Sequence, residues 1–164
     1  MLFVVMLGGK HPRANIEVHD VRFVLGESLE AAYPQLREGW FGKPRGLHID
    51  SWMRVDGVEG YKVELSPLAP APDTPRLFFL NLGGYEAGRF GEAHSYLLVV
   101  ARDPLEAKAK GKRQMLAHWH KAHTDALLDV DDCLPIDQLE GRYIHLVPGP
   151  HQGLVQHNDY IVIG

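Results

Sequence analysis

Two short segments of the chain carry side chains that could do acid–base or metal chemistry. Glu17 and His19 stand two residues apart, and so do His48 and Asp50. Residues i and i+2 of a strand lie on the same face, about 7 Å apart, so each pair would present a carboxylate and an imidazole together. If the two strands are neighbours, the four groups could bind a divalent metal or work as a paired acid and base.

All four of these positions recur further along the chain. At an offset of 75 residues the counterparts are Glu92, His94, His123 and Asp125. These eight residues form our candidate polar site, without a catalytic role for any one of them. A structural alternative stays open, because carboxylate–imidazole pairs also serve as satisfied polar contacts beneath a helix.

An internal repeat surrounds the candidate residues. Eight positions between residues 2 and 24 are identical at the offset of 75. Such self-similarity is the signature of a tandem duplication. We expect residues 1–67 to form repeat one, 68–76 a Pro-rich linker, 77–148 repeat two, and 149–164 a C-terminal tail with a final strand.

Each repeat should place two strands before a helix and two after it. In the first repeat we expect strands at 2–7, 16–25, 47–55 and 61–65, and a helix at 29–40 that Pro34 interrupts. The alternation also puts His48, Asp50 and Trp52 on one strand face. The second helix should start after Asp103, with Pro104 at its first position. The expected fold is α+β: two β-β-α-β-β repeats related by a pseudo-two-fold axis, their sheets packed into one compact domain.

Three segments carry a resemblance to a known family. They are Leu2-Phe3-Val4-Val5-Met6-Leu7-Gly8-Gly9-Lys10, Asn15-Ile16-Glu17-Val18-His19-Asp20 and His48-Ile49-Asp50-Ser51-Trp52. They resemble a bacterial family of domains of unknown function, number 1543, whose members carry the domain in one or two copies. The resemblance covers residues 2–55 closely and 77–131 more loosely. It implies no activity, substrate or cofactor.

The composition excludes several classes of protein. The net charge of the 164 residues is −4, and neither half has the basic surplus of a nucleic-acid binder. The apolar run at 1–7 is too short to cross a bilayer, so we expect no membrane association. The single cysteine, Cys133, rules out an internal disulfide and favours the cytoplasm, where we expect it to be a small buried residue.

Two functions remain open from the sequence. The first is a non-catalytic module that binds a small molecule or a protein, with a cleft at the interface between the repeats. The alternative is a metal-dependent hydrolase that uses the repeated Glu/His/His/Asp set, with a divalent metal as cofactor. No nucleophile elbow, zinc-protease motif or dinucleotide fingerprint is present to decide between them. The sequence also leaves a homo-oligomer open.

Overall fold

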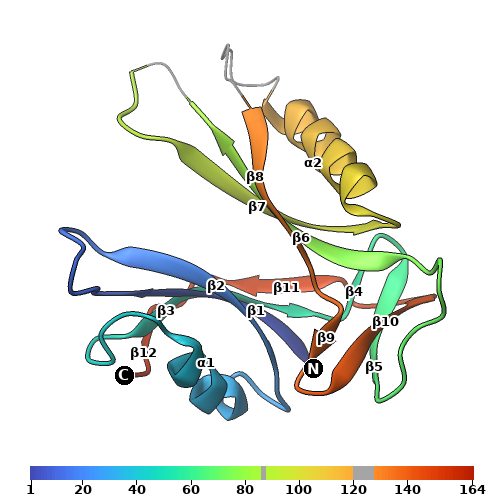
Figure 1. Cartoon of the computed structure of the whole chain (residues 1–164), viewed down its shortest axis with the longest axis horizontal. Coiled ribbons are helices and arrows are strands. Elements are labelled where there is room, and N and C mark those ends of the chain that lie inside the picture. Colours follow the sequence, from blue (N-terminus) through green and yellow to red (C-terminus); the bar gives the residue numbers. More distant parts are fainter. Residues whose placement is uncertain (86–87, 120–127) are drawn as a thin grey trace. The chain divides into compact units, whose positions relative to one another are not determined.

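The computed structural model of the chain describes residues 1–85, 88–119 and 128–164, and it is a mixed α+β structure with antiparallel sheets (Figure 1). The chain divides into two compact units. Unit 1 consists of Met1–Val63 and Pro148–Gly164, and unit 2 of Glu64–Val147. Neither described helix combines the length and the apolar character needed to cross a membrane.

The central sheet of unit 1 is built around its first strand. β1 (Leu2–Gly9) lies between β2 (Val18–Leu25) and β3 (His48–Val55), antiparallel to both. It is buried almost throughout, as expected for an apolar middle strand. Two strands from the end of the chain, β11 (Leu154–His157) and β12 (Ile161–Val162), also pair with β3. β12 falls within the segment predicted to form the last strand.

One face of this sheet packs against the helical segment between β2 and β3. The core contains Phe3, Val5 and Leu7 of β1 together with Ala32 and Leu36 of that segment. Because side chains alternate along a strand, the residues between them, including Gly8, lie on the other face. The candidate polar residues belong to that other face.

The helical segment itself differs from the single helix predicted at 29–40. It consists of a 3-10 turn, η1 (Glu30–Ala32), followed by a short helix, α1 (Tyr33–Gly39). Pro34 stands in the first turn of α1. Proline fits there because the amide hydrogen that it lacks would have no partner within the helix. Pro34 therefore marks where the α-helix begins.

Unit 2 has a three-stranded sheet and a longer helix. β6 (Arg76–Gly84) lies between β7 (Ala93–Ala101) and β8 (Leu128–Pro135), antiparallel to both. α2 (Pro104–Trp119) packs against this sheet, with Ala107 and Met115 in the shared core. Asp103 caps the helix as predicted, since its Oδ1 accepts the Glu106 amide hydrogen at 2.8 Å.

Short strands complete each unit. Unit 1 contains β4 (Gly57–Val58), which pairs with the start of β5 (Tyr61–Ser66). In unit 2, β9 (Gln138–Leu139) pairs with β10 (Arg142–Pro148). Both hairpins turn through a glutamate followed by a glycine, each with positive φ: Glu59 (52°) and Gly60 (84°), and Glu140 (50°) and Gly141 (73°).

Candidate functional site

A β-bulge in β3 brings the polar residues of unit 1 together. Gly8 pairs with His48 and Leu7 with Ile49, but Met6 pairs with Ser51. Asp50 is therefore the extra residue of the bulge, and such residues re-aim the side chains around them. The bulge corrects one prediction: Trp52 packs with the core on the helix side, while His48 and Asp50 face each other on the opposite side.

The four predicted residues of unit 1 lie close together, as their contact distances show. His48 Nε2 lies 3.5 Å from Glu17 Oε1 and 3.4 Å from Asp50 Oδ1. His19 Nε2 lies 3.5 Å from the same Glu17 oxygen and 3.2 Å from Asp50 Oδ2. Each imidazole therefore contacts both carboxylates. We call this set the unit 1 cluster: Glu17, His19, His48 and Asp50.

The unit 1 cluster has a buried side and an open side. His48 is only 2% exposed, whereas the His19 side chain is 50% exposed. His48 Nδ1 lies 2.9 Å from the Gly46 carbonyl oxygen. A carbonyl only accepts hydrogen bonds, so Nδ1 carries a hydrogen, and Nε2 is the ring nitrogen that faces the carboxylates.

Two buried atoms of the unit 1 cluster have no hydrogen-bond partner. They are His48 Nε2 and Asp50 Oδ2. Asp50 Oδ2 lies 3.2 Å from His19 Nε2, so the approach is close enough for a hydrogen bond but wrongly directed. Buried polar atoms without a partner are rare and often mark an absent ion or water. Within the cluster, these two atoms are the ones that a ligand or a water molecule would satisfy.

Gly8 leaves the space that these atoms surround. A Cβ at Gly8 would lie 2.5 Å from both His48 Nε2 and Asp50 Oδ2, and 3.2 Å from His19 Cδ2. Any larger residue at position 8 would thus collide with the cluster. A glycine is therefore required at position 8, because it leaves room between the side chains of the unit 1 cluster.

The structure also brings candidate residues of unit 2 together, but in a different set. His94 Nδ1 lies 3.4 Å from Asp131 Oδ2, and His94 Nε2 lies 3.9 Å from Glu92 Oε2. One ligand atom from each of the three lies within 4.8 Å of the others. A Cβ at Gly83 would lie 2.3 Å from Asp131 Oδ2. We call this set the unit 2 cluster: Glu92, His94 and Asp131.

Sequence reasoning missed Asp131. It is the bulge residue of β8, since Leu82 pairs with Val130 and Asn81 with Asp132. The candidates His123 and Asp125 lie outside the described residues. A signal for Asp131 was present, because Leu128-Asp129-Val130-Asp131 resembles Leu47-His48-Ile49-Asp50 at an offset of 81. At the offset of 75, Asp50 aligns with Asp125 instead, so Asp131 was not identified.

The residue in register with His48 differs between the units. Gly8 pairs with His48, whereas Gly83 pairs with Asp129. Asp129 Oδ1 is bound by Lys112 Nζ at 2.8 Å, and this hydrogen bond holds the pKa of Asp129 below its usual value. Asp129 is therefore engaged elsewhere, and the unit 2 cluster has one imidazole where the unit 1 cluster has two.

Comparisons with known proteins find relatives of the chain. The profile of the family described as Domain of Unknown Function (DUF1543) matches residues 14–65. The crystal structure of a protein Il1583 from Idiomarina loihiensis is 38% identical, with a TM-score of 0.76; the match covers 99% of this chain and 97% of that one. Residues 14–65 therefore match a DUF1543 domain. A search of curated proteins gave no match.

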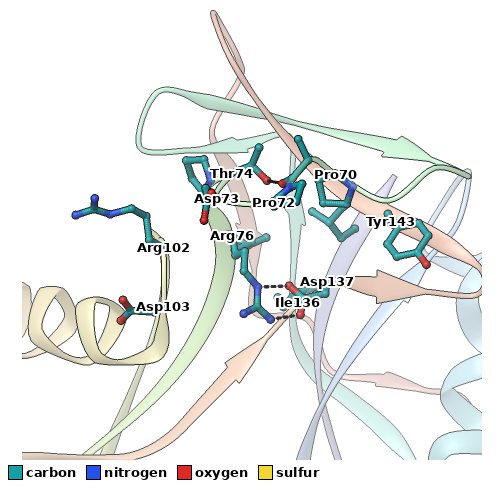
Figure 2. Close-up of a pocket in the computed structure, with 14 residues that line it drawn as sticks. Pro70, Pro72, Asp73, Thr74, Arg76, Arg102, Asp103, Ile136, Asp137 and Tyr143 are labelled. Carbon is teal, nitrogen blue, oxygen red and sulfur yellow. Dashed lines mark hydrogen bonds and ion pairs between the residues drawn. The ribbon is translucent and has the colours of Figure 1, made fainter.

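The protein has a further pocket in unit 2, shown in Figure 2. Its volume is about 650 Å³, and the loop Pro70–Pro75 forms part of its wall. Three of its charged side chains already have partners within the unit: Arg76 forms a two-pronged ion pair with Asp137, and Arg102 contacts Glu106. The pair with Asp137 raises the pKa of Arg76.

The wall of this pocket offers fewer polar groups for binding a ligand than the unit 1 cluster does. Asp103, also on the wall, is engaged as the cap of α2 (Figure 2). None of the described residues of the pocket wall has a buried side-chain polar atom without a hydrogen-bond partner. The ligand cleft predicted between the two repeats stays a prediction. Of the arrangements described, the unit 1 cluster has the most specific geometry.

Proposed function

We propose that the protein is a binding module whose ligand is a divalent metal ion, held by the unit 1 cluster. The observation that carries this proposal is the buried His48 Nε2, which faces two carboxylates and has no hydrogen-bond partner. A metal ion would provide that partner. Imidazole nitrogen and carboxylate oxygen are both common ligands of zinc and related ions.

The distances within the cluster support this assignment. With ligand bonds of about 2.0–2.1 Å, neighbouring ligand atoms of a tetrahedral zinc site lie roughly 3.3–3.4 Å apart. The four imidazole–carboxylate contacts of the unit 1 cluster range from 3.2 to 3.5 Å. Direct hydrogen bonds would be shorter, with a typical N···O distance of about 2.9 Å. Glu17, His48 and Asp50 each offer a ligand atom within 4.8 Å of the other two, and His19 contacts both carboxylates from the open side.

The outer contacts of the cluster support it too. Metal-binding histidines commonly donate their second ring N–H to a carbonyl or carboxylate, which fixes the tautomer and the ring orientation. The contact between His48 Nδ1 and the Gly46 carbonyl has this form. The buried imidazole of His48 among the ligands favours zinc or a neighbouring transition metal over magnesium or calcium, which prefer oxygen.

We propose a weaker role for the unit 2 cluster. It offers one imidazole, His94, whose Nδ1 also lies 3.1 Å from Asn81 Oδ1. Its side chains are all partly exposed, so no buried atom depends on an ion there. We therefore expect tight binding of one ion per chain, at the unit 1 cluster.

A metal-dependent hydrolase is the second candidate. Partial exposure favours it, because the side chains of Glu17 and Asp50 are 39% and 31% exposed and could admit water or substrate beside the ion. When bound, the ion would polarise a substrate oxygen or lower the pKa of a water molecule. Metal-dependent hydrolysis of simple ester and phosphoester substrates, lost on chelation, would favour this candidate over a binding module.

A tandem duplication accounts for both clusters, and we infer it from three likenesses. The sheets of both units have a middle strand with a bulge in the partner strand. Both hairpins contain a glutamate and a glycine with positive φ. The amide hydrogens of Val63 and Ile144 are donated to Asp56 and Asp137 carbonyls, at 2.9 and 2.8 Å. These likenesses support the duplication and the two β-β-α-β-β repeats.

The test of the proposed function compares Zn²⁺ binding after substitution of two glycines, Gly8 and Gly83. Zn²⁺ is titrated into chelator-stripped protein by calorimetry, with a competing chelator if binding is tight. Gly8→Ala should abolish the tight site, because the added carbon would collide with two ligand atoms. Gly83→Ala is the matched control, and it should leave one tight ion per chain. Parent protein without a tight site, or equal loss in both variants, would overturn the proposal.

A further inference from the structure

The segment Tyr160–Gly164 returns to the strand that carries His48. Ile161 pairs with Ile49, and Val162 pairs with His48 itself. The amide hydrogens of Ile163 and Gly164 are both donated to the Leu47 carbonyl, at 2.9 and 3.1 Å. The backbone on either side of His48 Cα is therefore fixed by this segment.

The ring of Tyr160 lies on the imidazole of His48. The two ring centroids are 4.4 Å apart, with 33° between the ring planes. Tyr160 is 69% exposed, while His48 is 2% exposed, so the tyrosine ring covers the imidazole on its solvent side. Packed aromatic rings restrict each other's rotation.

Gly46, whose carbonyl accepts a hydrogen bond from His48, is itself hydrogen-bonded to the same segment. His48 Nδ1 contacts the Gly46 carbonyl at 2.9 Å, and the Gly46 amide hydrogen is donated to the Gly164 carbonyl at 3.4 Å. The segment thus acts on His48 in two ways, through its ring and through its outer partner. Both contacts fix the direction of Nε2.

We propose that Tyr160 is a positioning residue of the metal site. Its ring holds His48 with Nε2 directed at Glu17 and Asp50, so that less conformational freedom is lost when the ion binds. This inference rests on the proposed function. Outer residues that orient a metal-binding histidine typically change metal affinity about 10- to 100-fold when they are removed.

The experiment measures Co²⁺ affinity and the visible spectrum of the Co²⁺ form, using the full chain. Tyr160→Ala should weaken binding about tenfold and change the spectrum, because His48 is no longer held at one angle. Tyr160→Phe keeps the ring and should restore both the affinity and the spectrum. Val162→Ala is the matched control in the same segment, where the side chain is 60% exposed. It should bind Co²⁺ within about twofold of the parent.

Several outcomes would overturn the inference. Parent-like affinity and spectrum in Tyr160→Ala would show that the ring does not position His48. So would equal losses in Tyr160→Ala and Val162→Ala, or a failure of Tyr160→Phe to restore binding. If the alanine variant does not fold, Tyr160→Leu takes its place; it keeps an apolar cover without the flat ring, and parent-like binding there would be equally decisive. A parent protein that binds no Co²⁺ would overturn the proposed function as well, which separates the two failures.

Discussion

At the scale of single residues, the position of His48 is the main feature to explain. A buried polar group that loses its partner costs about 1–3 kcal/mol. His48 Nε2 and Asp50 Oδ2 both lack hydrogen-bond partners, so the folded protein bears this cost at the metal-free site. An ion that binds the folded state alone would offset this cost.

Metal binding should therefore raise the stability of the protein. At a free Zn²⁺ concentration 100 times the Kd, the free energy of unfolding should rise by about 2.7 kcal/mol. Urea unfolding followed by circular dichroism, with and without the ion, measures this. Glu17→Gln should lose most of the gain, whereas Glu92→Gln, the matched change in unit 2, should keep it. A gain that survives in Glu17→Gln would place the ion elsewhere.

A second prediction at this scale concerns Cys133. Burial raises the pKa of its thiol, an effect that nearby Lys108 only partly opposes. A raised pKa means less thiolate at any given pH, so at pH 8 alkylation should be slower in the folded protein than in urea. The folded-state rate should keep rising with pH above 9. Because Cys133 is the single cysteine, mass spectrometry reports on it alone. Faster alkylation in the folded state would contradict the prediction.

At the scale of elements, the sequence predicted the middle strands and the pairing of polar residues, but not the bulges. Strict alternation puts His48, Asp50 and Trp52 on one face, and nothing in the residue types marks Asp50 as an extra residue. The bulge is set by pairing with β1, which is a long-range property. For the same reason Asp131 was not identified. Its role depends on its register with β6, and the offset between the two segments is 81 there instead of 75.

Helix ends were more predictable, because they depend on local chemistry. Asp103 and Pro104 marked the start of α2 correctly. Pro34 fixed the start of α1, although the prediction placed it inside a longer helix. The residues before Pro34 form a 3-10 turn instead, in which the Tyr33 amide hydrogen is donated to the Glu30 carbonyl. Pro34 has no amide hydrogen to give that carbonyl the bond of an α-helix.

The cap of α2 gives a prediction for an element. Asp103→Ala removes the acceptor of the Glu106 amide hydrogen and should lower the free energy of unfolding by about 1 kcal/mol. Ser28→Ala is a useful comparison, because Ser28 Oγ accepts the Ala31 amide hydrogen at a longer 3.3 Å, beside only a 3-10 turn. Its loss should be smaller. Urea unfolding measures the loss of unfolding free energy in both variants. A larger loss in Ser28→Ala than in Asp103→Ala would contradict the prediction.

At the scale of the whole molecule, the two units differ in how the chain builds them. Unit 2 is one continuous stretch, Glu64–Val147, whereas unit 1 combines Met1–Val63 with Pro148–Gly164. The sequence suggested a tail after two complete repeats. The structure gives that tail strands β11 and β12, which belong to the sheet of unit 1. Composition alone does not reveal which sheet a late strand joins.

This division predicts the behaviour of fragments. Residues 1–67 lack both late strands, so one edge of β3 would be left unpaired and His48 uncovered. The isolated fragment should give a poorly dispersed NMR spectrum. A permuted chain that joins 148–164 through a short flexible linker to residues 1–63 should give a better dispersed one. A well-dispersed spectrum from monomeric 1–67 would contradict the prediction.

The late return of the chain to β3 also fixes an order of events during synthesis. Unit 2 is complete once residue 147 has left the ribosome, but the sheet of unit 1 must wait for residues 154–162. Its first three strands emerge with an open edge and stay so while more than half of the chain is made. Because Tyr160 follows unit 2 in the chain, the nascent chain can gather Glu17, His19, His48 and Asp50 before unit 2 is made but can secure His48 only afterwards. The proposed metal site is thus finished after unit 2, and a cell that supplies the ion at that moment would load a chain whose unit 2 is already made.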